Sequence, residues 1–161
     1  MVRVGRRAYG ARTSCALKVP NISQLTTKVE EELKDDNLKN FTIIKADLES
    51  TYQNRTINIE DILNHTRQIR SITGEKAEKS FIDVSGVAAK ELDATICKII
   101  YIEIEAKENE ADLSNTKKFF AWVNMLNRDY PKEIFTSNYD LIIEKSLEAI
   151  RIPHFDGFVG S

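Results

Sequence analysis

The sequence predicts an α/β fold in which a large helical insertion separates two strands. Two observations favour this class. First, an apolar pair, Ile134 and Phe135, leads through a polar stretch directly into an amphipathic helix. Second, the long middle of the chain carries apolar residues at helical spacing. With 161 residues, the chain has the length of one domain with a core of its own.

Composition and charge give no support for nucleic acid, a membrane or a metal ion as a partner of this chain. The formal net charge is −2, so no general basic field favours nucleic acid or an anionic membrane. No apolar run reaches membrane-spanning length. Cys15 and Cys97 lie far apart without metal-ligand spacing, so we expect no metal and two reduced thiols in a cytoplasmic protein. The basic start, whose first acid is Glu30, leaves open a transit peptide or a start that is not genuine.

Three helices are expected in the first half of the chain. The first begins with Ser23 as N-cap, and the third begins at Asn58 with acids in its first turn. The second, within residues 38–52, is ambiguous because part of it also has strand propensity, and we favour the helix. The predicted buried stripes are Leu25, Val29 and Leu33; Phe41, Ile44 and Leu48; and Ile59, Ile62, Leu63 and Ile69.

The second half predicts a polar loop at 73–80, a long helix at 87–107 and a helix capped by Ser114 or Asn115 that ends before Pro131. A strand at 133–136 and a helix at about 139–149 follow, and Pro153 lies beyond that helix. The predicted buried stripes are Leu92, Ile96, Ile99 and Ile100 in the long helix, then Phe119, Phe120, Val123 and Leu126 in the next.

One candidate site lies near the start of the chain, in "YGARTSCALKVPNIS". Gly10 and Ala11 precede Thr13 and Ser14 there. Small residues let backbone amides approach a phosphate closely, and hydroxyl groups add donors. A helix that begins near Thr13 would add a favourable dipole. The alternative interpretation is an ordinary turn between a strand and a helix.

A second candidate site lies where the later strand gives way to a helix, at Thr136, Ser137, Asn138 and Asp140. In open α/β sheets, ligands bind beyond the carboxyl ends of strands. A purely structural interpretation makes Ser137 the N-cap and Asp140 its capping-box partner. That interpretation leaves Asn138 without a role, and its amide can both donate to and accept from a sugar or a water.

The closing run "FTSNYDLIIEKSLE…IPHFDGFVG" resembles the bacterial defence-type branch of the sirtuin-like NAD-binding family, in which a strand ends in Thr-Thr-Asn-Tyr-Asp. The segment "GARTSCALKVPNISQLT" is similar to the Gly-Ala-Gly-x-Ser segment of that family, and the two motifs occur in the family's order. The resemblance implies a Rossmann-like parallel sheet in a single domain over residues 1–161. A helical insertion would span about 38–130, and the sheet would be incomplete at its C-terminal end.

The resemblance also implies the roles of individual residues. Phosphate contacts of NAD would come from Gly10, Ala11, Thr13 and Ser14, with Arg12 able to clamp a phosphate. Pro20 would lie in a loop over the nicotinamide, and Thr136 and Ser137 would contact the ribose. Two residues would take part in catalysis: Asn138 would orient the ribose or the attacking water, and Asp140 would lie near the nicotinamide carboxamide.

This sequence departs from the family pattern in several places. Arg12 stands where the family has its second glycine, and Lys18 replaces the glycine of a Gly-Val-Pro phrase. Arg3, Arg6 and Arg7 interrupt a first strand that should be apolar. The family's catalytic base is a histidine in a Leu-His-Gly phrase, and these 161 residues contain no such phrase. We therefore expect the chain to be the front part of a longer protein.

The resemblance implies hydrolysis of NAD+ to nicotinamide and ADP-ribose by the complete protein, in the cytoplasm and in anti-phage defence. Two alternatives remain open at this point. One is a non-catalytic module that binds NAD, ADP-ribose or a partner protein, and the other is an inactive truncated product. The expected partners are NAD or ADP-ribose, together with a second copy of the chain or an effector protein.

Overall fold

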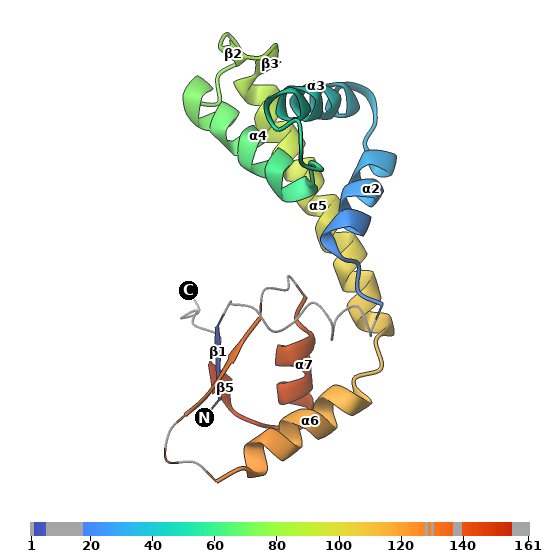
Figure 1. Cartoon of the computed structure of the whole chain (residues 1–161), viewed down its shortest axis with the longest axis vertical. Coiled ribbons are helices and arrows are strands. Elements are labelled where there is room, and N and C mark those ends of the chain that lie inside the picture. The colour runs from blue at the N-terminus through green and yellow to red at the C-terminus, as the bar shows by residue number, and fades with distance from the viewer. Residues whose placement is uncertain (1, 6–17, 128, 130, 137–139, 156–161) are drawn as a thin grey trace. The chain divides into compact units, whose positions relative to one another are not determined.

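The computed structural model describes residues 2–5, 18–127, 129, 131–136 and 140–155 (Figure 1). The chain divides into two compact units, which are described separately. The helical unit is Asn21–Glu103, and the sheet unit is Met1–Pro20 together with Ile104–Ser161. One helix, α5 (Gly86–Glu110), begins in the first unit and ends in the second.

The helical unit is built from amphipathic helices whose apolar faces form its core. Its other helices are α2 (Ile22–Glu32), α3 (Asp35–Thr51) and α4 (Ile59–Thr73). The predicted buried stripes are confirmed for α2, α3 and α4, except that Leu63 is only partly buried. The largest side chains that are almost completely buried in this unit are Val29, Phe41, Ile44, Ile59, Ile62, Ile69, Val84, Leu92 and Ile96.

Side-chain caps fix where two of these helices begin. The N-cap of α2 is Asn21 rather than Ser23, because Asn21 Oδ1 accepts from Gln24 N while Gln24 Oε1 accepts from Asn21 N. In α4, Asn58 Oδ1 accepts from the backbone of both Glu60 and Asp61, at 2.9 and 3.2 Å. These bonds satisfy first-turn amides that have no partner within the helix.

Replacing Asn58 with alanine should lower the free energy of unfolding by about 1 kcal/mol, the usual cost of losing such a cap. The reason is that the Glu60 and Asp61 amides lose their acceptor. Urea unfolding followed by circular dichroism measures this loss. Asn54→Ala is the matched control, because Asn54 is exposed in the loop before the helix. Equal loss in both variants would contradict a capping role for Asn58.

A short hairpin at 80–85 follows α4 and the polar loop that was predicted at 73–80, in a stretch where no strand was predicted. Strands β2 (Ser80–Phe81) and β3 (Val84–Ser85) pair antiparallel, and the turn between them places Ile82 and Asp83 at φ 47° and 62°. Such turns favour Asn-Gly, because both central residues need positive φ. The Ile-Asp pair lacks this sequence pattern, which is why the hairpin was not predicted.

The sheet unit holds a short parallel sheet next to two helices. Its elements are β1 (Val2–Gly5), α6 (Ser114–Met125), β4 (Lys132–Phe135), α7 (Ile142–Ala149) and β5 (His154–Phe155). The strand order is β4-β1-β5, with both pairings parallel. Phe120, Leu147 and Ile152 form the buried core of this unit. Phe119, predicted to be buried, is 53% exposed, because α6 turns Phe120 rather than Phe119 toward α7.

The predicted fold class, an α/β fold with a Rossmann-like parallel sheet, is wrong. Most of the described chain is helical, and the parallel strands are only four, four and two residues long. A Rossmann-like sheet has longer strands that are buried on both faces. In β4, partly buried and exposed residues alternate instead, and Phe135 is 44% exposed. Local strand propensity revealed where β4 lies but not how small the sheet is.

The helical unit begins at Asn21 and ends at Glu103, whereas the predicted insertion spans about 38–130. The assignment of residues 1–161 to one sirtuin-like domain stays a prediction. None of the helices in the described part of the chain combines the length and the apolar character needed to cross a bilayer.

Candidate functional site

The carboxyl edge of the parallel sheet is the candidate site. Gly5, the last residue of β1, is the register partner of Phe135, the last residue of β4. Because the two strands are parallel neighbours, the chain leaves both of them at the same edge. Strand β5 pairs with the other side of β1 in the same direction. This is the edge of a parallel sheet at which ligands bind.

Two predicted site residues flank the turn between β4 and α7, and both are buried. Thr136 is 4% exposed and Asp140 is 6% exposed. Asp140 Oδ1 accepts a hydrogen bond of 3.2 Å from Ile142 N, the first residue of α7. Asp140 therefore lies directly before Leu141, the N-cap of α7, and this helix begins at Ile142 and not near Tyr139 as predicted. The structural alternative that the sequence offered, with Asp140 as the capping-box partner of Ser137 inside the helix, is wrong for Asp140, because this residue precedes the helix.

Sequence analysis missed a third polar residue at this turn, Glu108 from the last turn of α5. Its side chain is only 5% exposed. Glu108 Oε1 accepts from Leu141 N at 2.7 Å, and Oε2 lies 2.5 Å from Lys145 Nζ. One signal could have revealed it: Glu108 continues the buried stripe of Ile96 and Ile104 at helical spacing. A carboxylate on an apolar stripe needs a buried partner.

The two carboxylates determine what the start of α7 can do chemically. Asp140 and Glu108 already accept from the amides of Ile142 and Leu141. Negative charge is favourable at a helix N-terminus, so both carboxylates also interact with the helix dipole. A ligand phosphate would have to displace them to reach these amides. The start of α7 is therefore better suited to a neutral part of a ligand, such as a sugar, than to a phosphate.

The other predicted site residues are not brought to this turn by anything the structure describes. Pro20 is partly buried and lies directly before Asn21, the N-cap of α2. The phosphate-binding candidates Gly10, Ala11, Arg12, Thr13 and Ser14 lie outside the described residues, as do Ser137 and Asn138. The meeting of the two motifs stays a prediction.

The described contacts of the two histidines are local. His154 lies in β5, with Nδ1 3.4 Å from the Ile152 carbonyl oxygen. His65 lies in the helical unit, with Nε2 3.2 Å from Asp47 Oδ2. Each ring therefore has a local contact in its own unit, and neither contact involves the turn at residues 136–140.

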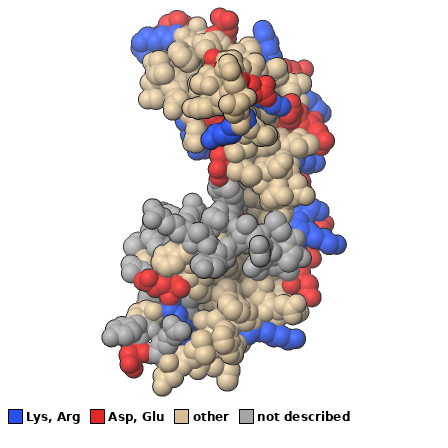
Figure 2. Space-filling view, in the orientation of Figure 1, with Lys and Arg blue, Asp and Glu red and all other residues tan. Residues whose placement is uncertain are grey.

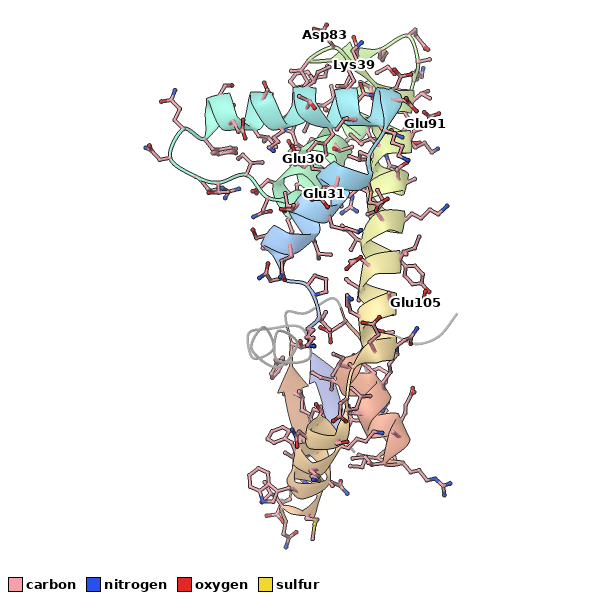
Figure 3. All side chains as sticks on the ribbon, turned by 90° about the vertical axis from the view of Figure 1, so that its right-hand side faces the viewer. Glu30, Glu31, Lys39, Asp83, Glu91 and Glu105 are labelled. Carbon is pink, nitrogen blue, oxygen red and sulfur yellow. The ribbon has the colours of Figure 1, made fainter. Side chains whose placement is uncertain are left out.

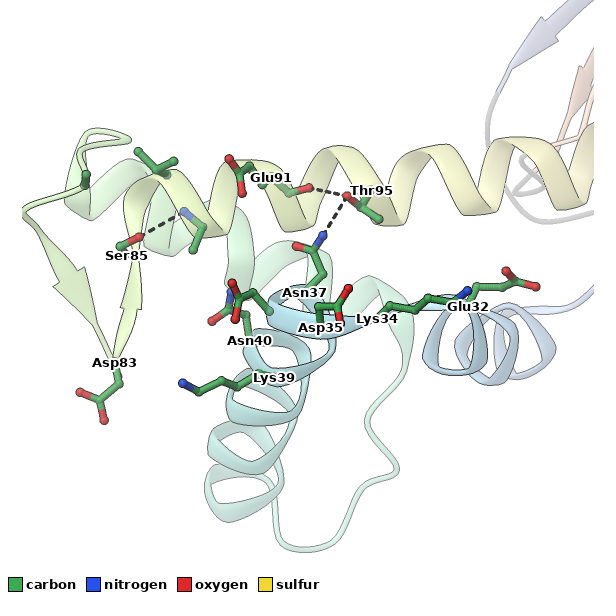
Figure 4. Close-up of a pocket in the computed structure, with 14 residues that line it drawn as sticks. Glu32, Lys34, Asp35, Asn37, Lys39, Asn40, Asp83, Ser85, Glu91 and Thr95 are labelled. Atoms are coloured by element: carbon green, nitrogen blue, oxygen red, sulfur yellow. Dashed lines mark hydrogen bonds between the residues drawn. The ribbon is translucent and has the colours of Figure 1, made fainter.

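A separate hollow of about 780 Å³ lies in the helical unit, between the end of α2, the start of α3, the hairpin and the first turns of α5 (Figure 4). Its charged lining residues are Glu32, Lys34, Asp35, Asp36, Lys39, Asp83 and Glu91. Figure 3 shows Lys39, Asp83 and Glu91 at the same end of this unit. Inside the hollow, Asn37 Nδ2 donates to Thr95 Oγ1 at 3.4 Å, an interaction drawn in Figure 4.

The lining of this hollow does not select one ligand chemistry. Five acidic side chains and two lysines line it together with uncharged residues, and on the face shown in Figure 2 the basic residues of the unit are interspersed with acidic ones. Within the described ranges, no three His, Cys, Asp or Glu side chains gather where they could hold a metal ion. The hollow is therefore not assigned a function.

Comparison with known proteins adds no family to this picture: no family model matches the chain, and no curated protein and no solved structure matches it significantly.

Proposed function

We propose that this chain binds NAD or ADP-ribose at the carboxyl edge of the β4-β1-β5 sheet. The sugar next to the nicotinamide would meet the turn at residues 136–140, and the phosphates would meet residues 10–14. In this proposal the chain is the nucleotide-binding part of a sirtuin-like NAD hydrolase that acts in cytoplasmic anti-phage defence. A second copy of the chain or an effector protein would complete the assembly.

The observation that carries the proposal is the register of β1 with β4. Gly5 pairs with Phe135, so the two segments that bear the family-like motifs leave the sheet side by side at one edge. Burial of Thr136 and Asp140 at that edge gives further support, because buried polar groups in the turn are held in fixed positions. In this proposal a dinucleotide at that edge would reach both the motif "FTSNYD" and the segment that follows β1.

The chemistry that such a site would perform is cleavage of the bond between ribose and nicotinamide. Nicotinamide leaves with the bonding electrons as a neutral molecule, and a water adds to the ribose carbon and gives up a proton. The Asn138 amide could orient the sugar or the water, but it has no group that titrates near neutral pH and cannot accept that proton. Turnover therefore needs a base other than Asn138, and the Leu-His-Gly phrase that carries the family's base does not occur in these 161 residues.

The absence of a Leu-His-Gly phrase favours a second candidate, binding without turnover. This candidate keeps the same ligand and the same site. We expect the 161-residue chain to bind ADP-ribose and to release no nicotinamide from NAD+. A fluorescent assay for nicotinamide distinguishes the two candidates, because release at a rate above that of the buffer would support the hydrolase for this chain itself.

Asn138→Ala should weaken ADP-ribose binding about tenfold, since it removes both a donor and an acceptor from the proposed ribose contact. Isothermal titration calorimetry on the full chain measures the affinity. The matched control is Asn115→Ala, because Asn115 is exposed on α6. If the unaltered chain produces no heat with millimolar ADP-ribose or NAD, the proposed function is wrong. If Asn138→Ala binds normally, the ribose contact is assigned to the wrong residue.

A further inference from the structure

Glu108 makes contacts that reach the candidate site from a distant part of the sequence. It lies on α5, yet its carboxylate bonds to Leu141 N and to Lys145 Nζ around the start of α7. Leu141 is the residue directly after Asp140. Lys145 N in turn donates to Leu141 O at 2.8 Å, the bond that joins Leu141 to the first turn of the helix. The buried carboxylate of Glu108 therefore holds both Leu141, where this first helical turn starts, and Lys145, where it ends.

From these contacts we propose that Glu108 is a positioning residue for nucleotide binding at Asp140 and the start of α7, an inference that rests on the proposed function. Glu108 would not touch the ligand. It would hold the Leu141 amide, and through it the backbone of Asp140, in the geometry that the ribose and nicotinamide require. No other described side chain is bonded to Leu141 N.

The burial of Glu108 argues against an incidental surface ion pair. Its side chain is 5% exposed, while that of Lys145 is 34% exposed. Removing a carboxylate from water is costly, and an apolar residue would continue the stripe of Ile104 without that cost. The carboxylate supplies what an apolar side chain cannot, an acceptor for a backbone amide that has no partner within α7.

The two contacts of Glu108 can be separated by substitution. Glu108→Ala removes the acceptor for Leu141 N and the ion pair together. Glu108→Gln removes the ion pair but keeps a side-chain oxygen that can accept from Leu141 N. Lys145→Ala also removes the ion pair and leaves the bond to Leu141 N. Glu110→Ala is the control, because Glu110 lies on the same helix and pairs only with the partly exposed Lys107 in the described contacts.

The test measures ADP-ribose affinity by calorimetry and unfolding temperature by circular dichroism for the full chain and these four variants. We expect Glu108→Ala to weaken binding about tenfold, and Glu108→Gln and Lys145→Ala to weaken it by less than about threefold. The unfolding temperature should instead fall in all three variants, because each loses the ion pair. The affinity for ADP-ribose would then depend on the side-chain oxygen that accepts from Leu141 N, whereas the unfolding temperature would depend on the ion pair with Lys145.

Three results would overturn the inference. Normal binding by Glu108→Ala would show that the position of Leu141 does not matter for the ligand. Binding by Glu108→Gln as weak as that by Glu108→Ala would assign the effect to charge rather than to positioning. A lack of binding by the unaltered chain would reject the proposed function itself, and this inference with it.

Discussion

Replacing Asp93 with alanine is expected to lower the free energy of unfolding by about 3 kcal/mol, in the range for breaking a buried ion pair. The Asp93 side chain is 7% exposed and lies in α5. It accepts from Arg67 Nε and Nη2 at 3.2–3.4 Å and forms an ion pair with Arg70. Removing it leaves two guanidinium groups without a shared acceptor. The Arg67 side chain is half exposed and can be rehydrated, which keeps the loss near the lower end of the range.

Urea unfolding at pH 7 measures this loss, with Glu91→Ala as the matched control. Glu91 is exposed on the same helix, so its replacement should change stability by less than about 0.5 kcal/mol. Arg70 is also bonded to Glu75, so its replacement alone affects more than one contact. A double-mutant cycle of Asp93 and Arg70 isolates the interaction free energy of this ion pair. Equal effects of Asp93→Ala and Glu91→Ala would show that the buried carboxylate contributes no more than a solvated one.

The contribution of Asp93 should also depend on pH. Burial tends to raise the pKa of Asp93, but hydrogen bonds and charge from Arg67, with bonds from Cys97 and Arg70, outweigh it and hold the pKa below its ordinary value of 3.8. A carboxyl whose pKa is lower when folded stabilises the fold above its unfolded pKa. The stabilisation is lost as the pH falls through the folded pKa. The difference between the native chain and Asp93→Asn should therefore be constant above about pH 5 and shrink below pH 4.

Gly86→Ala is expected to cost about 3 kcal/mol, even though alanine is the better helix former. Gly86 begins α5, and a Cβ at this position would lie 2.4 Å from Thr73 Oγ1 and 2.6 Å from Lys76 N. The second of these atoms belongs to the backbone, so rotating a side chain cannot relieve the contact. Gly86 N also donates to the carbonyl oxygens of Lys76 and Lys79, both at 3.1 Å, which hold it in place.

Gly74 provides a matched comparison, because it is restricted by conformation rather than by space. It ends α4 in the left-handed region, with φ 61°, and a Cβ there would meet nothing within 4 Å. Gly74→Ala should cost about 1 kcal/mol, and Gly74→Asn less, since asparagine tolerates this conformation. Thermal and urea unfolding of the three variants give the order. A stabilising Gly86→Ala would mean that helix propensity outweighs the close approach of α4 to α5.

The helical part of the fold could be predicted because its determinants are local. Leu25 and Val29, or Ile59, Ile62 and Ile69, mark buried helical faces by their spacing alone. The ambiguous segment at residues 38–52 forms a helix, because its length and its apolar spacing outweigh a short stretch of strand propensity that begins at Phe41.

The pairing of the strands could not be predicted in the same way, because it is not a local property. Strand β1 contains Arg3 in four residues, and β5 has only two residues. Neither is long enough to show a period of two. The parallel sheet depends on partners far apart in the sequence, such as Arg3 with Glu133 and with Phe155. The expectation of a larger Rossmann-like sheet came from the family resemblance and not from strand patterns.

The candidate site was predictable only in part, for a related reason. Thr136 and Asp140 adjoin a strand and a helix that the sequence reveals, so their turn could be located. Glu108 joins this turn through the tertiary fold, and its helical spacing alone does not say which backbone amide it meets. Burial of a charge can be suspected from sequence, whereas its partner requires the coordinates.

The pairing of Val2 with Lys132 has a consequence for how the chain folds during synthesis. The first strand emerges from the ribosome early, but both of its neighbours are made after the whole helical unit. Helices with contacts close in sequence form quickly, while long-range strand pairs wait for loop closure. The helical unit should therefore complete its core first, and β1 should remain without a partner strand until β4 has been synthesised.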